Sequence, residues 1–428
     1  MALSKRAVKI TKKSCSCTMP GIWKAVAHNP GALVIFHSPW GCGHVTREMD
    51  LGGQYRALSR RYFVSGGYTA PLIISGLKEE HSIFGGEDLL RRCIDASVER
   101  HHPAYILIAA SCVSGVIGDD TMAVAREAEK KWGIPVMASA CGGFLDGDYY
   151  TGFYEAGRLL AERFLSKQTT DPDRVTLLGD QGGPSAPDAL EIKELLRDLG
   201  LKSFSHFPSY SSVEEMEIIP SSAFSLAVGG ADHSAVWLRK MGTDLQKRWE
   251  VPFFDGGFPV GLAGTTQWLQ KLGAFAGREE ASQKTADRLN IRLLTALADF
   301  AAAVKGMQTL LCIGRSRDFF NPEWVIELFS LTGAPLAGIV LLESLTEEQR
   351  GVMERELALQ TTTPVFYEAE AEGVLTEADL VLTTHELQDT VPRQLFLPLL
   401  TPVGISGTLT LAEKMVRMAR RKGGMVYV

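Results

Sequence analysis

Cys112 stands where a buried strand is predicted to end. The preceding run, 105–110, is short, continuously apolar and rich in β-forming residues, and a helical pattern over 121–131 follows. This order predicts that Cys112 is a loop residue at the carboxyl end of a parallel strand. Because βα loops converge at that edge and ligands bind there, Cys112 is a candidate site residue.

Cys42 repeats this arrangement. It follows the apolar run 32–37 and lies between Gly41 and Gly43. Glycine lets a backbone approach a bulky ligand closely, and its amide N–H can point at sulfide or thiolate. For a single loop of this kind, a glycine-rich turn holding an inert thiol is the better explanation. Two such loops in one domain favour a site.

A third candidate is Cys17, in a polar segment for which an extended conformation is predicted. Only one ligand is expected from the pair Cys15 and Cys17. The spacings of 25 residues from Cys17 to Cys42 and 70 from Cys42 to Cys112 match no compact ferredoxin or zinc-ribbon motif. A shared metal site would have to be assembled by the fold.

Three thiolates on one face suit an iron–sulfur cluster, which takes four or more such ligands. The missing ligands would come from a partner chain. The sequence therefore predicts an oligomer with the cluster at its interface.

The remaining candidates have simpler explanations. Cys93 lies in a helical pattern and Cys312 in a predicted strand, so both are interpreted as small buried hydrophobes. His44 and His233 are weaker site candidates, because a lone histidine is more often structural or solvated. The carboxylates in Ile117-Gly-Asp-Asp120 are interpreted as an ordinary helix cap.

The composition narrows the function classes. A charged content of 22% and a formal net charge of -6 give no electrostatic footprint for nucleic acid. The first residues lack the apolar core of a signal peptide, and no apolar run approaches the ~20 residues needed to cross a bilayer. Seven cysteines are too sparse for a secreted disulfide scaffold. We expect a cytoplasmic protein without nucleic-acid or membrane partners.

Apolar runs alternate with longer helical patterns along most of the chain, which predicts an α/β fold with parallel sheets. Ten strands are expected, at 32–37, 71–75, 105–110, 135–139, 175–178, 224–229, 309–314, 338–342, 364–367 and 380–383. This number exceeds one sheet of usual size. A charged, Pro-containing link at 166–173 and a long helical pattern at 277–303 suggest three Rossmann-like domains, at 1–170, 171–300 and 301–428.

Taken in order, these elements resemble the component 1 subunits of nitrogenase and its relatives. The combination of Phe-Gly-Gly with Cys-x4-Ile-Gly-Asp-Asp is highly specific. Weaker matches follow at 258–262 and 404–414. The main matching elements are Cys17, His37-Ser-Pro-Trp-Gly-Cys42, Glu80-His-Ser-Ile-Phe-Gly-Gly86, Ser111-Cys-Val-Ser-Gly-Val-Ile-Gly-Asp-Asp120 and Ala140-Cys-Gly-Gly-Phe144.

The resemblance implies three Rossmann-like domains and a paired-subunit assembly. Cys17, Cys42 and Cys112 match the cysteines with which each subunit of the family holds an interfacial cluster, either a P-cluster-like 8Fe-7S group or a 4Fe-4S cluster. The partner implied is a homologous α-type subunit or a second copy of this chain. Electrons would come from a separate ATP-dependent iron protein, in keeping with the lack of a nucleotide-binding glycine motif here.

Two departures modify this expectation. The family's α-type subunit holds its catalytic cofactor through a cysteine and a histidine, whereas 232–237 here contains no cysteine and 396–402 no histidine. Serine and leucine replace such ligands poorly. The chain therefore resembles a β-type subunit, or a member with a different cofactor, in a complex that could hold a second, iron–sulfur-based catalytic cofactor. It is also shorter than the nitrogenase subunits, which favours a substrate other than dinitrogen.

The expected function is that of an electron-transfer subunit of a nitrogenase-like reductase. Among the family's substrates, methylthio-alkanes or an unassigned compound are expected before dinitrogen. One alternative is a scaffold on which a nitrogenase-type cofactor is assembled. Another is a binding protein that kept the fold and lost its cluster.

Overall fold

Three parallel sheets organise the chain. The computed structural model describes residues 17–59, 68–139, 142–179, 183–229, 232–387, 393–398 and 401–420, without the side chains of 51–59, 204, 232 and 233. By internal contacts the chain divides into two compact units: unit 1 is Met1–Gln168 with Ser205–Ile219, and unit 2 is Thr169–Phe204 with Pro220–Val428. The expected α/β class is confirmed, and the three-domain division remains a prediction.

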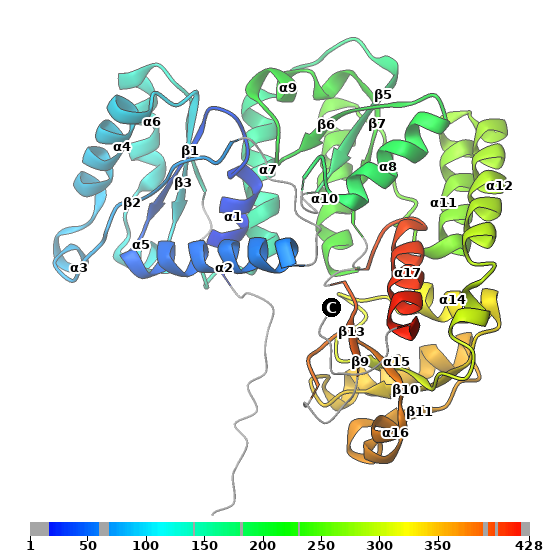
Figure 1. Ribbon diagram of the computed structural model, residues 1–428. Helices are drawn as coiled ribbons and strands as arrows, with labels where there is room; N and C mark the ends of the chain where they lie inside the picture. The colour runs from blue at the N-terminus through cyan, green and yellow to red at the C-terminus, as the bar shows by residue number, and fades with distance from the viewer. Residues whose placement is uncertain are drawn as a thin grey trace, which may run out of the picture. The chain divides into compact units, whose positions relative to one another are not determined.

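Unit 1 is built on a four-stranded sheet of order β2-β1-β3-β4, in which every pair is parallel (Figure 1). All six residues of β1 and of β3 are buried, as expected for strands covered on both faces. The strands are β1 Ala32–His37, β2 Leu72–Ile74, β3 Tyr105–Ala110 and β4 Val136–Ser139. The helices are α1 Met19–Val26, α2 Trp40–Ser59, α3 His81–Phe84, α4 Glu87–His101, α5 Cys112–Ile117, α6 Thr121–Trp132, α7 Tyr149–Phe164 and α9 Val213–Glu217.

A buried asparagine explains why unit 1 includes a segment from beyond residue 200. Asn29 Nδ2 donates hydrogen bonds to the carbonyl of Pro208 (2.9 Å) and to the hydroxyl of Tyr105 (3.2 Å), and its Oδ1 accepts one from the amide of Ser211 (3.2 Å). A buried amide left without these partners would cost free energy. The segment 205–219 thus completes the polar core of unit 1.

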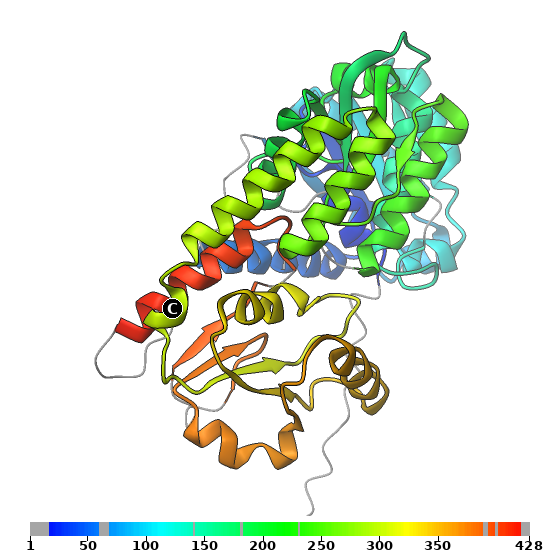
Figure 2. The same ribbon diagram turned by 90° about the vertical axis from the view of Figure 1, so that its right-hand side faces the viewer.

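The other two sheets, of order β6-β5-β7-β8 and β11-β10-β9-β12-β13, belong to unit 2, except that β6 continues past residue 204 into the segment assigned to unit 1. Figure 2 shows α11 and α12 running side by side. The strands are β5 Asp171–Leu178, β6 Lys202–Phe207, β7 Ser222–Ala227, β8 Phe253–Phe254, β9 Thr309–Ile313, β10 Leu336–Leu341, β11 Val365–Tyr367, β12 Leu380–Thr383 and β13 Gln394–Phe396. The α-helices are α8 Pro187–Asp198, α10 Asp232–Trp249, α11 Gly261–Ala276, α12 Glu279–Ala296, α13 Phe300–Ala303, α14 Glu323–Thr332, α15 Glu347–Gln360, α16 Glu372–Glu377 and α17 Ser406–Arg420. Short 3-10 helices lie at Ile219–Ser221 and Glu368–Glu370.

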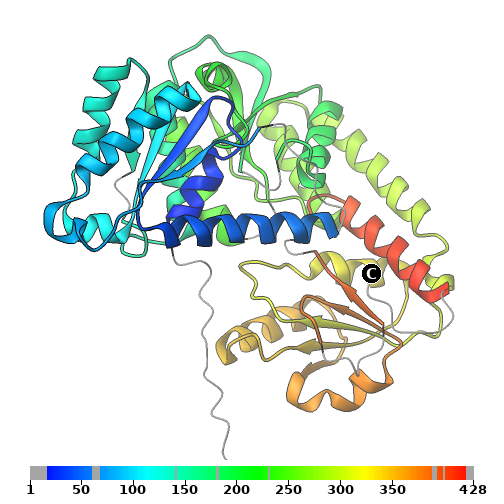
Figure 3. The same ribbon diagram turned by 60° about the vertical axis from the view of Figure 1, so that its left-hand side comes forward.

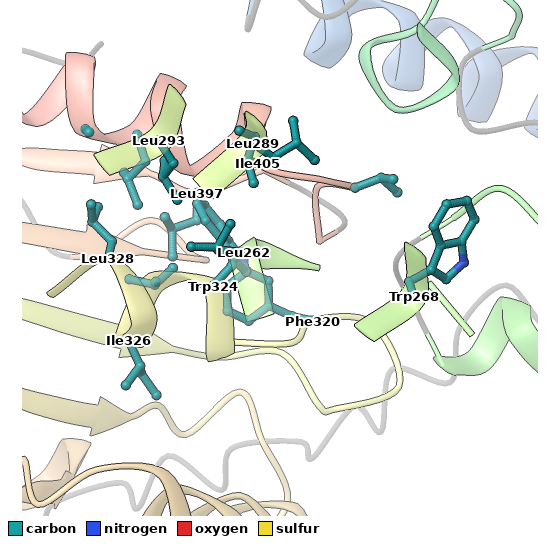
Figure 4. Packing of buried hydrophobic residues seen from close by; sticks show 14 of the residues in the cluster. Leu262, Trp268, Leu289, Leu293, Phe320, Trp324, Ile326, Leu328, Leu397 and Ile405 are labelled. Carbon is teal, nitrogen blue, oxygen red and sulfur yellow. The ribbon is translucent and has the colours of Figure 1, made fainter. Parts of the chain in front are cut away.

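One apolar core runs through unit 2 and joins helices that follow different sheets. Trp268 of α11, Leu293 of α12 and Trp324 of α14 are each at most 2% exposed and belong to it, as does Ile405 beside α17 (Figure 4). Burying side chains of this size contributes about 2 to 3 kcal/mol each. In the described part of the chain, no helix is long and apolar enough to span a bilayer.

All ten expected strands are present. Three of them, β1, β3 and β12, have the expected ends and the others have shifted ends, and three further strands of the described residues were missed. The missed strands, β6, β8 and β13, each lie at the edge of a sheet. The helix expected over 277–303 is interrupted, because α12 ends at Ala296 and the short α13 begins at Phe300.

Two carboxylates of α8 hold the chain that leads into α17. Asp188 accepts a hydrogen bond from the amide of Val403 (3.1 Å), and Glu191 accepts from the amide of Ile405 (3.0 Å) and from the Ser406 hydroxyl. Burial raises the pKa of Asp188 to about 6; the Val403 amide opposes this shift and the charge of Glu191 adds to it. The folded chain therefore binds this proton more tightly than the unfolded chain.

This raised pKa makes the free energy of unfolding fall as pH rises from the ordinary value near 3.8 to about 6. Asp188→Asn keeps an acceptor oxygen without the charge, so we expect it to be more stable than the wild type at neutral pH and nearly equal to it near pH 4. The full effect of ~3 kcal/mol is reduced to about 1 to 2 kcal/mol by partial exposure of the carboxyl. Thermal unfolding at both pH values measures it. Asp287→Asn, on the exposed side of α12, is the control, and an equal gain there would contradict the assignment.

Candidate metal centre

The carboxyl edge of the first sheet brings the candidate cysteines together. In the order β2-β1-β3-β4, the connections turn in opposite directions from β1, so the topological switch point lies between β1 and β3. Cys42 follows β1 and Cys112 follows β3, one on each side of this point. His37 and Ala110 are paired in register, and the amide of Ser111 donates to the carbonyl of His37 (3.2 Å). Figure 1 shows α3, α5 and the start of α2 at this end of the sheet.

Cys112 is the first residue of α5 rather than a loop residue, which corrects the sequence expectation. Ser111 is the helix N-cap, and its hydroxyl accepts a hydrogen bond from the amide of Ser114 (3.2 Å). The helix continues through Gly115 and ends at Gly118, which has a φ of 87°.

Cys42 also lies in a first helical turn, because α2 begins at Trp40 where a glycine-rich loop was expected (Figure 3). A Cβ on Gly43 would lie 2.0 Å from Ile74 Cδ1, so this glycine allows α2 to pack on β2. Beside Gly41, in contrast, no heavy atom of the described residues lies within 4 Å of where a Cβ would stand, apart from its chain neighbours and the backbone of its own helix. The backbone before Cys42 is therefore open to a bulky ligand, and the backbone after it is not.

The two thiols influence each other electrostatically. Burial raises the pKa of Cys42, a hydrogen bond with Ser38 opposes the shift, and the charge of Cys112 raises the pKa further. Both thiols are partly exposed. A bound metal would supply a positive charge that favours the thiolate form of Cys42.

Cys17 reaches the same edge through its neighbour. The amide and the hydroxyl of Thr18 both donate to the carbonyl of Gly143 (3.3 and 3.2 Å), in the segment after β4. Gly143 has a φ of 57°, and a Cβ there would lie 2.8 Å from the amide nitrogen of Cys112. We call the surface that carries Cys17, Cys42 and Cys112 the cysteine edge.

The spacing of these groups does not suit a single ion. Among the residues that the structure describes, no three His, Cys, Asp or Glu side chains are close enough to share one metal ion. An iron–sulfur cluster is larger than an ion and accepts thiolates that stand further apart. By residue type, the three thiols suit part of an iron–sulfur cluster site, since thiolates are the usual ligands of such clusters.

Of the two cysteines that were interpreted as structural, Cys312 is buried and Cys93 is partly buried. Cys93 packs against the core of unit 1, and burial raises its pKa to about 11. Cys312 is fully buried in β9, and burial raises its pKa to about 12. His44 is exposed on α2, while Cys15, Cys141 and the side chain of His233 lie outside the described residues.

Sequence reasoning missed the buried polar contacts behind the cysteine edge. His37 Nε2 lies 2.9 Å from Asp119 Oδ2, and His37 Nδ1 lies 3.0 Å from Ser75 Oγ. Asp119 Oδ1 also accepts a hydrogen bond from the amide of Gly86 (2.8 Å). Of the adjacent pair, only Asp120 is the expected helix cap, accepting from the amide of Ala123 (2.8 Å). The apolar strand before His37 was the available signal, since a histidine that continues such a strand is buried and needs partners.

Large apolar side chains are exposed after every strand of the first sheet. Phe84 is 86% exposed, Val116 79% and Ile83 77%. Single exposed hydrophobes are normal, whereas a group of them on neighbouring elements marks an interaction surface. We call the group the exposed apolar set; it comprises Trp40, Val45, Met49, Ile83, Phe84, Val113, Val116, Met122, Phe144 and Leu145.

The parallel sheets and the cysteine edge define an α/β protein with thiols at a topological switch point. Residues 17–415 match the family model of nitrogenase component 1 type oxidoreductases, and the chain belongs to this family.

Similar proteins include catalytic subunits and cofactor biosynthesis proteins. The chain is 25% identical to the nitrogenase molybdenum-iron protein alpha chain of Methanosarcina barkeri, over 66% of this chain and 52% of that protein. It is 30% identical to the nitrogenase iron-molybdenum cofactor biosynthesis protein NifE of Clostridium pasteurianum, over 59% of this chain and 52% of that protein. The chain thus spans about half the length of these relatives.

The solved structure of nitrogenase Cp1 at pH 5 has the same fold, with a TM-score of 0.64, 18% identity, and coverage of 98% of this chain and 91% of that one. The expected resemblance to nitrogenase component 1 is confirmed. The relatives named here are α chains and NifE proteins, so the narrower expectation of a β-type subunit has no support from them.

Differences in burial predict a labelling order for the thiols. In iron-free native protein near neutral pH, we expect maleimide to modify Cys42 and Cys112 well before Cys312, which should react only after unfolding. Peptide mass spectrometry at successive times gives the order. Equal rates for Cys112 and Cys312 would contradict the burial described here.

Proposed function

We propose that this chain is a subunit of a nitrogenase-like reductase that holds an interfacial iron–sulfur cluster through Cys17, Cys42 and Cys112. The cluster would pass electrons from an ATP-dependent iron protein to a catalytic site that reduces a small or cofactor-like substrate. The observation that carries this proposal is the meeting of three thiol-bearing segments at the switch point of one parallel sheet.

The donor set supports an iron–sulfur group. Thiolates are the usual ligands of such clusters, and a bound cluster, 8Fe-7S or 4Fe-4S, supplies one-electron transfer. Cys42 and Cys112 would bind from two adjacent helix N-termini, and Cys17 from the segment that Thr18 ties to Gly143. Three thiols are fewer than a cluster needs, so a partner chain completes the site.

The exposed apolar set supports the same partner arrangement. Five of these side chains, Trp40, Val45, Met49, Val113 and Val116, lie on α2 and α5, the helices that carry Cys42 and Cys112. A second subunit could cover them and exclude water from the cluster. The partner is a homologous α-type subunit or a second copy of this chain, and the iron protein is a further partner. A cytoplasmic location remains the expectation from the sequence.

The absence of a cysteine from the middle of the sequence bears on the substrate class. Between Cys141 and Cys312 the sequence has no cysteine, so no thiolate is available at the exits of the second sheet to hold a nitrogenase-type catalytic cofactor. A substrate other than dinitrogen, such as a methylthio-alkane, agrees with this. Any second catalytic cofactor would depend on ligands from the partner.

Iron binding tests the cluster. Anaerobically purified protein from iron-replete cells is expected to contain iron and acid-labile sulfide, and Cys112→Ala is expected to lose most of both. Cys93→Ala is the matched control and is expected to keep them, because Cys93 packs in the core. Iron and sulfide analysis with EPR provides the measurement. A colourless, iron-free wild-type protein would rule out the cluster.

Charge placed in the exposed apolar set tests the interface. Phe84→Glu is expected to weaken assembly with the partner at least about tenfold, because a desolvated carboxylate at an apolar interface costs more than 1.4 kcal/mol. Leu359→Glu, at an equally exposed position on α15, is the control. Native mass spectrometry of complexes co-expressed with the operon partners gives the assembled fraction. Unchanged assembly in Phe84→Glu would remove this face from the interface.

A cofactor-assembly scaffold is the second candidate, and the 30% identity to a NifE protein favours it. The two roles differ in turnover. With an iron protein, ATP and a reductant, a reductase consumes substrate from a panel of dinitrogen, tetrapyrrole rings and methylthio-alkanes. A scaffold consumes none of them and instead transfers its metal cluster to an apo-acceptor subunit.

A further inference from the structure

The buried imidazole of His37 stands at the centre of a polar network that connects four segments at the cysteine edge. We call Ser75, His37, Asp119 and Gly86 the His37 network. The side chains of His37 and Asp119 are 0% and 3% exposed, and Ser75 is 9% exposed. The network therefore lies within the fold, behind the surface that carries the thiols.

The donors and acceptors of the His37 network can be assigned one after another. The amide of Ser38 donates to Ser75 Oγ (3.1 Å), which leaves the Ser75 hydroxyl proton free to reach His37 Nδ1. A carboxylate only accepts, so His37 Nε2 carries the proton that it shares with Asp119. This assigns the neutral Nε2–H tautomer. Burial lowers the pKa of His37, in agreement with a neutral ring, while Asp119 and Glu87 oppose the shift and His81 adds to it.

Gly86 could not be another residue. A Cβ there would lie 2.5 Å from Leu77 Cδ2, 2.7 Å from Asp119 Oδ2 and 3.0 Å from His37 Cε1. The turn after α3 is thus pressed against the histidine–aspartate pair. Its amide completes the pairing of the second carboxylate oxygen (2.8 Å).

The same residue types form hydrolytic triads, but the geometry here excludes that role. In a triad the serine bonds Nε2 and the aspartate bonds Nδ1, and the two are reversed here. Ser75 Oγ is also buried and already accepts from the amide of Ser38. The serine therefore has neither the access nor the orientation of a nucleophile.

We infer that Asp119 is a positioning residue for the cysteine edge: its two carboxylate oxygens fix the β1 exit that leads to Cys42 and the turn that carries Phe84 relative to α5, which begins at Cys112. This inference rests on the proposed iron–sulfur function, because positioning matters where thiols must meet a rigid cluster. Asp119 contacts no thiol in this arrangement. It acts through His37, whose carbonyl accepts from the amide of Ser111, and through Gly86.

Adjacent aspartates provide a matched test. Asp119→Ala leaves His37 Nε2 and the Gly86 amide without their acceptor, whereas Asp120→Ala removes only an exposed helix cap. We expect iron per chain to fall about tenfold in Asp119→Ala, as for other residues that orient metal ligands, and to be unchanged in Asp120→Ala. Equal iron in the two variants would overturn the inference while leaving the cluster proposal intact.

Asp119→Asn is a second variant that separates a loss of positioning from general misfolding, because the side chain keeps nearly the same size. Its amide keeps an acceptor for Gly86 but loses the charge that favours protonated His37, so the pKa of His37 is expected to move lower still. NMR titration of labelled histidine, assigned with His37→Gln, measures this shift. A purely space-filling Asp119 would leave the titration unchanged, and that result would overturn the inference.

Hydrogen exchange on iron-free protein separates the two proposals. We expect faster amide exchange in peptides covering 37–43, 84–87 and 111–118 in Asp119→Ala, and wild-type exchange there in Asp120→Ala. If the wild type binds no iron but this difference appears, the cluster proposal fails and the positioning role stands. If exchange at the cysteine edge is the same in both variants, the positioning role fails whatever the iron content.

Discussion

Burial of the His37 ring at the end of β1 constrains the whole carboxyl edge of the first sheet. An imidazole removed from water without partners costs free energy at both nitrogens, so both must be paired inside the protein. Ser75 comes from the exit of β2 and Asp119 from the segment after α5. Satisfying one ring therefore fixes three segments that lie far apart in the sequence. The thiols of Cys42 and Cys112 stand on the segments held in this way.

The cysteine edge combines this rigidity with exposure. Behind it lie a buried polar network and two fully buried strands, β1 and β3. On its surface are partly exposed thiols and the exposed apolar set. In such a combination, a rigid scaffold presents thiols and apolar side chains that a partner chain could contact. A nitrogenase component 1 type subunit that shares a cluster with its partner would have this character, and so would a scaffold that passes a cluster on.

The sequence predicted the buried strands better than the edge strands. All seven strands that lie inside the described sheets were predicted, because such strands are covered on both faces and must be apolar throughout. Of the six edge strands, β2, β4 and β11 were predicted, whereas β6, β8 and β13 were missed. The pattern of β8 is only two residues long, and four of the six residues of β6 are polar. The segment 205–219 was also unpredictable, since the hydrogen bonds of Asn29 that bring it into unit 1 cross more than 170 positions.

What the sequence determined by itself is the type and location of the candidate chemistry. An apolar strand followed by Cys112, another followed by Cys42, and a parallel sheet together imply thiols at one edge, because the carboxyl ends of parallel strands lie on the same side. Only the tertiary structure decided that both thiols begin helices, that Cys17 joins them through Gly143, and that Asp119 pairs with His37 while Asp120 caps a helix. Local patterns specify secondary structure, whereas the pairing of buried polar groups depends on which distant segments the packed fold brings within hydrogen-bonding distance.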